Sequence, residues 1–255
     1  MSDTMNIDDY LASGGVLTSP DNVPARYRGE LMRLMSSFVD SELAASAGFA
    51  ASINFAPGIR ERIAASRITL EKADHAERVL NVMGAFGTDI ARYQSQHDWA
   101  ARLARDADLG TARREGDMRL SVFHYPINSW TDAVVMNVLM GLATDVQMTE
   151  LTRISYGPLA EVFREIAPRE AAHAELGLEG LKAILETENG RRDAEEALAY
   201  WMPRVAATFG VSGSGRHETL ARFGLRHSTN ATLLARWQAL LADWLAPLGL
   251  ARAAT

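Results

Sequence analysis

Four long segments in which apolar residues recur every three or four positions constrain the fold of this chain most. They extend from Pro24 to a break at residues 56–58, from that break to about Phe86, onward from about Trp130, and from Ser155 to a turn at residues 187–190. Such spacing gives a helix one apolar face, whereas no stretch alternates in the way a half-buried strand does. The sequence therefore predicts an all-α fold, a four-helix bundle with additional C-terminal helices.

Shorter segments complete the expected architecture. Residues 1–22 are polar and rich in Gly, Ser and Asp, so we expect a flexible N-terminal arm followed by a single helical domain over residues 23–255. Three further helical regions are expected, at about 98–107, at roughly 193–209, and at about 216–246 with an interruption near 226–229. With 47% hydrophobic residues, a chain of this length has enough apolar material for a large core.

Ionisable residues stand inside the apolar stripes of three of the four long segments. They are Glu42 in the first segment, Lys72 and His75 in the second, and Glu170 and His173 in the fourth. Residues three apart share a helix face, so each His should lie beside its partner in the same segment. A buried charge must be paired, hydrogen-bonded or bound to metal. We therefore predict that these five side chains meet at one site.

The Glu-x-x-His spacing of Glu170 and His173 is half of a known metal-binding pattern. Bundles that hold two metal ions use a Glu from each of two helices and a Glu-x-x-His pair from each of the other two. Here the second segment offers Lys-x-x-His instead. The third segment has Gly141 at the expected level and Asp145 one turn later.

Composition excludes several classes of function. The chain has no cysteine, which rules out disulfides, thiolate metal sites and cysteine nucleophiles. A net charge of −6 gives no reason to expect nucleic acid or an anionic membrane as partner. There is no run of about eighteen apolar residues and no signal segment, so we expect a cytoplasmic protein.

Three motifs carry a resemblance to a known family. Phe123-His-Tyr-Pro126 through Trp130, Ser155-Tyr-Gly-Pro158 and Glu170-x-x-His173 resemble the oxygenase (A) subunits of bacterial phenylacetyl-CoA epoxidases. The resemblance covers most of residues 24–250. It implies a ferritin-like fold, membership of the phenylacetic acid catabolism family and a di-iron oxidoreductase that acts as a monooxygenase.

The resemblance also implies where metal ligands should stand. In that family they fall on Glu42, residue 72, His75, residue 141, Glu170 and His173. The family has Glu where Lys72 stands and Asp where Gly141 stands. Exchanging one carboxylate for an ammonium and deleting another changes the charge of the site by about three units, which disfavours two Fe²⁺ ions. We therefore expect no conventional di-iron centre, with Lys72 paired to Glu42 and Glu170 in place of a metal. Asp145 and Glu71 remain as candidate substitute ligands.

The first functional hypothesis is an enzyme without a cofactor that acts on a small aromatic, acyl-thioester or carrier-bound substrate. Lys72 would act as acid, base or amine nucleophile if burial lowers its pKa. His75 and His173 would move protons, and Glu42 and Glu170 would orient them.

Two alternatives stay open. Glu42, His75, Glu170 and His173 are a set that would suit a single Fe²⁺ or Mn²⁺ ion, and monooxygenation would then use electrons from a separate reductase. Otherwise the chain is a non-catalytic partner of a related ferritin-like subunit that keeps its di-iron centre. A homodimer is a further expectation.

Overall fold

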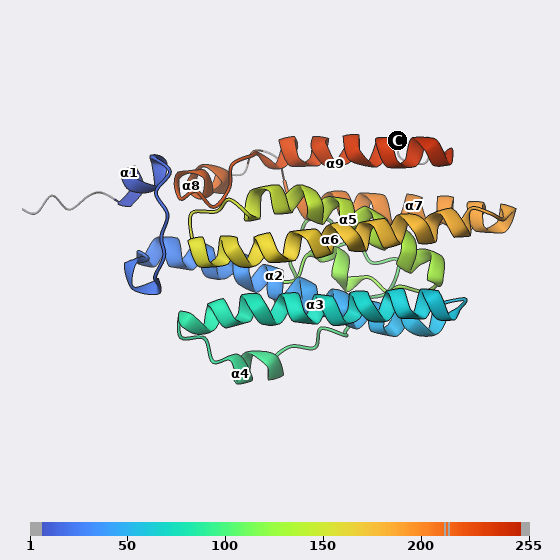
Figure 1. The fold of residues 1–255 in the computed structure, drawn as a ribbon, viewed down its shortest axis with the longest axis horizontal. Coiled ribbons are helices and arrows are strands. Elements are labelled where there is room, and N and C mark those ends of the chain that lie inside the picture. Colours follow the sequence, from blue (N-terminus) through green and yellow to red (C-terminus); the bar gives the residue numbers. More distant parts are fainter. Residues whose placement is uncertain (1–6, 212, 214, 251–255) are drawn as a thin grey trace, which may run out of the picture.

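Four long helices run side by side along the molecule (Figure 1). In this computed structural model, which describes residues 7–211, 213 and 215–250, they are α2 (Ala25–Ser52), α3 (Ile59–Ala85), α5 (Trp130–Leu151) and α6 (Gly157–Ile184). Their bounds confirm the four long predicted helices. The described residues contain no strand, and Leu17 and Tyr156 form an isolated parallel bridge.

The four helices form two packed pairs. Helix α2 packs on α3, helix α5 packs on α6, and the pairs meet mainly where α3 lies against α6. The stripe of α2 is fully buried at Leu31, Met35 and Val39. Because the next inward positions of that stripe follow at the same spacing, α2 carries Glu42 into the interior as the sequence predicted.

The C-terminal helices cover α5. Helices α7 (Glu188–Ala206) and α9 (Asn230–Leu245) pack against it, and the short α8 (Arg216–Arg222) lies at one end of the bundle (Figure 1). Helix α5 is therefore surrounded by α6, α7 and α9, and its residues 132–143 are all buried. The predicted helix at roughly 193–209 is confirmed, and so is the predicted helical region at about 216–246 with its interruption near 226–229. Short 3₁₀ turns follow or join the helices, at Pro20–Asn22, Ile53–Phe55, Ser121–His124, Ala207–Phe209 and Ala246–Leu248.

The predicted flexible arm is wrong for the residues that the structure describes, while residues 1–6 lie outside them. Helix α1 (Ile7–Ala12) packs on the bundle end, with Leu11 and Leu17 each only 4% exposed. The backbone N–H of Leu17 donates to the Ser155 carbonyl, and Leu17 accepts from Gly157. Two apolar side chains thus anchor a stretch whose composition looked like that of a mobile tail.

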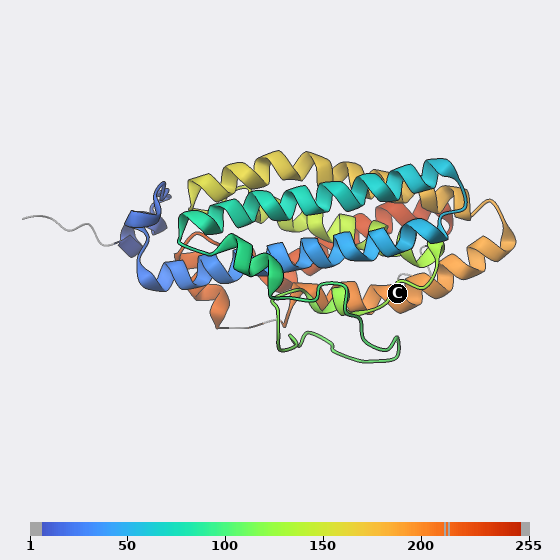
Figure 2. The same ribbon diagram turned by 90° about the horizontal axis from the view of Figure 1, so that it is seen from below.

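The predicted helix at about 98–107 is also wrong. The only helix in that region of the described chain is α4 (Ile90–Ser95), and an irregular segment follows along the outside of α2 (Figure 2). The buried Arg119 guanidinium donates to the carbonyl oxygens of Asp98, Trp99 and Ala101. The Asp98 carbonyl also accepts from the Ala101 N–H in a single turn, but the carbonyls of Trp99 and Ala101 are bound by side chains rather than by helical N–H groups.

Asp40 ties the same segment to the bundle. This carboxylate on α2 is 1% exposed and accepts from Tyr93 Oη at 2.8 Å, Trp99 Nε1 at 3.3 Å and the Met118 N–H at 2.6 Å. One buried acceptor thereby fixes both ends of the segment.

No helix among the described residues is long and apolar enough to cross a membrane.

Candidate active site: a charged cluster beside a pocket

The five predicted site residues meet in the centre of the bundle. Glu42 comes from α2, Lys72 and His75 from α3, and Glu170 and His173 from α6. All five are buried, and the most exposed of them, Lys72, is only 6% exposed.

Lys72 is the link between the two acidic residues. Its Nζ donates to Glu42 Oε1 at 3.1 Å and to the two oxygens of Glu170 at 2.8 and 2.7 Å. A single ammonium therefore bridges carboxylates from two different helices, which is the position that the sequence predicted for it.

His75 completes the inner part of the cluster. Its Nδ1 lies 2.7 Å from Glu170 Oε1 and 3.3 Å from Glu42 Oε2, and it donates because ionised carboxylates only accept. His75 Nε2 is buried and has no hydrogen-bond partner among the described residues. The two carboxylates are thus held by Lys72 on one side and by His75 on the other.

His173 points to a different partner. Its Nε2 lies 2.5 Å from Glu71 Oε2, while its Nδ1 lies 3.8 Å from Glu170 Oε1, too far for a hydrogen bond. Glu71 was considered as a substitute ligand because it stands four residues before His75. In the structure it pairs with His173 across the α3–α6 contact, and its side chain is 28% exposed.

The cluster stabilises the charged forms of its members. Burial alone would lower the pKa of Lys72, but Glu170 and Glu42 outweigh it and raise that pKa above its ordinary value. Burial also opposes protonation of His75, yet its hydrogen bonds to Glu170 and Glu42 raise the His75 pKa. The condition for a neutral, nucleophilic Lys72 is therefore not met, and this side chain is a fixed cation.

Glu170 should make stability depend on pH. Burial alone would raise its pKa, but Lys72 and the two histidines hold that pKa well below its ordinary value. The stability that ionised Glu170 contributes to the folded protein is complete above its unfolded-state pKa of about 4.3. It is lost as pH falls through the lower folded-state pKa of Glu170. His75, whose folded pKa is raised, stays protonated in both states below about pH 5 and adds no slope there. We expect the urea midpoint to fall between pH 5 and pH 3, and to fall less steeply in Glu170→Gln.

The matched control for this comparison is Glu175→Gln, an exposed glutamate on the same helix. It should keep the wild-type slope. Equal slopes for wild type and Glu170→Gln would contradict the assignment of the acid-sensitive charge to Glu170.

Helix α5 contributes no carboxylate to the cluster. Gly141 is buried against α6, and Asp145 is exposed. Asp145, a candidate substitute ligand from the sequence, therefore lies outside the cluster. Helix α5 is buried on nearly all sides only as far as Ala143, and one turn beyond Gly141 the helix faces solvent at position 145.

Two metal ions do not fit these residues. The ammonium of Lys72 already bonds both buried carboxylates, and position 141 supplies no ligand atom. The ligand atoms of Glu42, His75 and Glu170 do lie within 4.8 Å of one another. A single ion would fit among these three only if Lys72 moved away.

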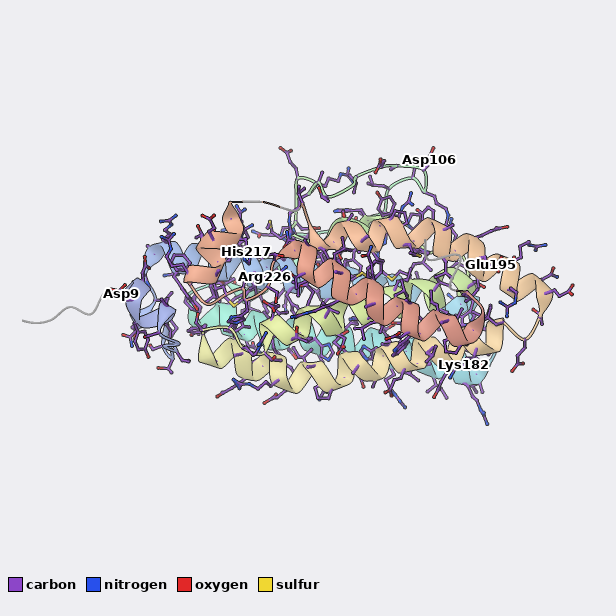
Figure 3. All side chains as sticks on the ribbon, turned by 90° about the horizontal axis from the view of Figure 1, so that it is seen from above. Asp9, Asp106, Lys182, Glu195, His217 and Arg226 are labelled. Atoms are coloured by element: carbon purple, nitrogen blue, oxygen red, sulfur yellow. The ribbon has the colours of Figure 1, made fainter. Side chains whose placement is uncertain are left out.

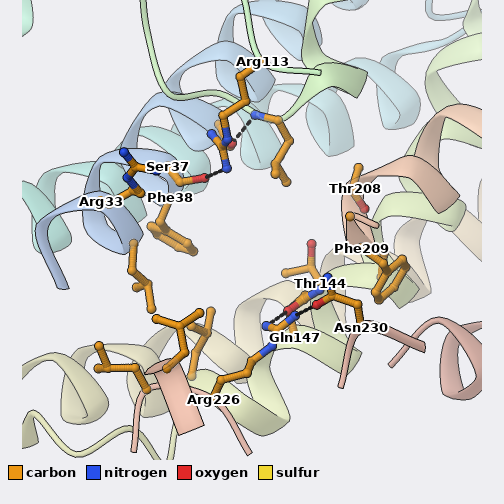
Figure 4. Close-up of a pocket in the computed structure, with 18 of the residues that line it drawn as sticks. Arg33, Ser37, Phe38, Arg113, Thr144, Gln147, Thr208, Phe209, Arg226 and Asn230 are labelled. Carbon is orange, nitrogen blue, oxygen red and sulfur yellow. Dashed lines mark hydrogen bonds between the residues drawn. The ribbon is translucent and has the colours of Figure 1, made fainter. Parts of the chain in front are cut away.

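A pocket of about 470 Å³ opens beside the cluster (Figure 4). Its inner wall is largely apolar and includes Phe38, Phe123, Met140 and Phe209. Among the five cluster residues, Glu42 is the one that lines it. A void of about 10 Å³ next to Lys72 and Glu170 shares Phe123, Met140 and Thr144 with the pocket, so these three side chains separate Lys72 from the larger space.

Four arginines stand around the pocket and were not predicted as site residues. They are Arg33, Arg113, Arg216 and Arg226, against the two acidic lining residues Glu30 and Glu42. Figure 4 shows Arg33 and Arg113 on one wall and Arg226 on the opposite one. Burial lowers the pKa of Arg113, and the neighbouring Arg216 and Arg33 lower it further. Like charges gathered in this way favour an anionic ligand.

Contacts with neighbouring side chains hold Arg226 and Arg113 in place. Arg226 donates to Gln147 at 2.7 Å and to Asn230 at 3.1 Å, and Arg113 donates to Ser37 Oγ at 2.9 Å. His217 also lines the pocket. It lies with Arg226 at the end of the bundle away from Lys182 and Glu195 (Figure 3). Arg33, Arg113 and the pair Arg216 and Arg226 come from three segments far apart in the sequence, so no local pattern could have brought all four together.

Comparison with known proteins gives a family and a relative. The family model described as "Phenylacetic acid catabolic protein" matches residues 5–254. A component of 1,2-phenylacetyl-CoA epoxidase from Escherichia coli (strain K12), its A subunit, is 24% identical over 208 residues, which is 80% of this chain and 62% of the relative. The chain therefore spans less than two thirds of that relative's length.

Proposed function

This chain belongs to the phenylacetic acid catabolic protein family, and from that premise we propose that it binds an acyl thioester and acts on the acyl group by metal-free acid–base chemistry. The family match confirms the resemblance found in the sequence. The all-α bundle is consistent with the ferritin-like fold expected from that resemblance. The reaction and the ligand are our proposal.

One observation carries the proposal: Glu42 lines the pocket and is also held by the Lys72 ammonium. A ligand in the pocket can therefore contact this carboxylate. A positioned carboxylate within hydrogen-bond reach of a substrate proton is a general base. Lys72 would keep Glu42 and Glu170 in place and balance their charge.

The pocket matches the two ends of an acyl thioester of an aromatic acid. Its apolar inner wall would enclose the acyl group, since apolar side chains with a few polar ones are typical of such sites. The arginines at its rim would bind phosphate groups of the carrier portion. The named substrate of the E. coli relative, phenylacetyl-CoA, has this combination and is the probe we choose.

The chemistry follows from the position of Glu42. A proton on the carbon next to the thioester carbonyl would pass to the Glu42 carboxylate, and the electron pair would stay on the acyl group as an enolate. The Glu42 carboxyl would exchange this proton with solvent, and return of a solvent proton to the same carbon would complete the exchange. Because the raised pKa of Lys72 keeps it charged, Lys72 provides positive charge near Glu42 and takes no part as a nucleophile.

The test is proton exchange in D₂O with phenylacetyl-CoA, followed by NMR. We expect wild type to exchange the protons next to the carbonyl, and Glu42→Gln to lower the exchange rate by at least about 100-fold. The dissociation constant measured by calorimetry should change by less than about threefold. Exposed Glu77→Gln on α3 is the control. Exchange at the wild-type rate in Glu42→Gln, or none in wild type, would contradict the proposed chemistry.

A second candidate function has one observation in its favour. Glu42, His75 and Glu170 bring three ligand atoms within 4.8 Å of one another, which would suit one Fe²⁺ or Mn²⁺ ion if Lys72 were displaced.

The E. coli relative is named as one subunit of an epoxidase. Association with a related subunit, or with a second copy of this chain, therefore also stays a prediction.

A further inference from the structure

Helices α5 and α6 touch most closely beside the charged cluster. A Cβ placed on Gly141 would lie 2.7 Å from Ala174 Cβ and 3.0 Å from Ala174 Cα. Carbon atoms in favourable contact are about 3.5–4.0 Å apart. At the present separation of the helices, position 141 therefore has no room for a side chain.

The close approach extends along α6 beyond this one contact. A Cβ on Gly177 would lie 2.8 Å from Asn137 Nδ2, and a Cβ on Gly180 would lie 3.2 Å from Val134 Cγ2. Asn137 Nδ2 also donates to the His173 carbonyl at 2.7 Å. Several buried contacts thus set the helix separation together, so a larger residue at position 141 cannot move α6 away cheaply.

We propose that the packing of Ala174 against Gly141 is a second barrier to a two-metal centre, independent of the charge of Lys72. A carboxylate at the level of the cluster would have to come from α5, because α2, α3 and α6 already supply Glu42, Lys72 and Glu170. Asp145, the nearest acidic residue on α5, is exposed. Removing the ammonium alone would leave this side of the cluster closed.

This inference goes beyond the proposed function, since it names Ala174 as a residue that decides which cation the cluster accepts. It predicts that rebuilding a two-metal site takes three changes. Lys72→Glu removes the ammonium, Gly141→Asp adds a ligand, and Ala174→Gly makes the space for it.

The test is iron content after anaerobic Fe²⁺ loading and gel filtration. We expect no more than about one iron per chain in the Lys72→Glu/Gly141→Asp double variant, because Glu42, His75 and Glu170 alone are close enough to share a single ion. We expect a second iron to bind when Ala174→Gly is added. Two irons in the double variant would overturn the proposal, and so would a folded triple variant that binds no more iron than the double.

A second test measures thermal stability in the absence of metal, and it decides the question if the triple variant does not fold. Gly141→Ala should lower the melting temperature by about 4 °C or more, because overpacking a tight contact destabilises. Adding Ala174→Gly should recover more than half of that loss. Ala174→Gly alone is the control, and it should lower the melting temperature because glycine within a helix normally destabilises. A Gly141→Ala protein within about 1 °C of wild type would overturn the proposal.

Discussion

Lys72→Met is expected to lower the free energy of unfolding by about 3–5 kcal/mol at pH 7, the range for breaking a buried ion pair by removing one partner. Glu42 and Glu170 are 5% and 1% exposed, and the Lys72 ammonium bonds both. Without it, two carboxylates would face each other in the interior with only His75 between them. Urea unfolding followed by circular dichroism measures the loss.

The chain's other lysine provides the control for this variant. Lys182 is exposed on α6, so Lys182→Met should change stability by less than about 0.5 kcal/mol. A Lys72→Met protein as stable as Lys182→Met would show that the carboxylates do not depend on the ammonium. They would then have to be protonated or hydrated in the folded protein.

The same variant separates the metal-free proposal from the single-metal alternative. An ion that binds only the folded state raises the unfolding midpoint, by an amount that grows with the logarithm of its affinity. We expect Mn²⁺ to raise the midpoint of Lys72→Met, because Glu42, His75 and Glu170 are already close enough to share an ion. Wild type should not respond. Equal stabilisation of wild type would favour the single-metal site.

The charged cluster was predictable from the sequence because helix periodicity is local. Glu42, Lys72, His75, Glu170 and His173 each stand within an apolar stripe, and a stripe in a bundle faces the centre. The pairing of Glu71 with His173 was not predictable. It depends on the rotation of α3 relative to α6, which the spacing within either helix does not determine.

The pKa of Lys72 is a second property that the sequence alone could not predict. Burial and carboxylate contact act on its pKa in opposite directions, and the result depends on how many carboxylates reach the ammonium. Glu170 offers both oxygens and Glu42 a third. Three acceptors on one ammonium decide the direction, and that number comes from tertiary packing.

The predictions for Asp145 and for a helix at about 98–107 differ from the structure for a related reason. Position 145 follows Gly141 by one turn, but α5 leaves the cover of its neighbours there. Residues 98–107 contain helix-forming Ala, Leu and Arg, yet Arg119 binds carbonyl groups in that stretch. In both places a tertiary contact, or its absence, outweighed the local pattern.

The arginines around the pocket give the second large expected effect. Arg33→Glu combined with Arg113→Glu should weaken the binding of phenylacetyl-CoA by at least about 100-fold, which is about 2.7 kcal/mol. Two positive charges that would bind phosphate become two negative ones that repel it. Isothermal titration calorimetry at low salt measures the change, and the wild-type affinity should fall as salt is raised.

The control changes the net charge equally at another place. Arg60 and Arg62 are exposed on α3 and do not line the pocket, so Arg60→Glu combined with Arg62→Glu should leave the affinity within about threefold. Phenylacetyl-pantetheine, which lacks phosphate, should bind wild type and the Arg33/Arg113 variant alike, because only the phosphates meet the arginines. If the Arg33/Arg113 variant weakened both ligands equally, the arginines would be shaping the pocket rather than binding an anionic carrier. The anionic end of the proposed ligand would then have to be placed elsewhere.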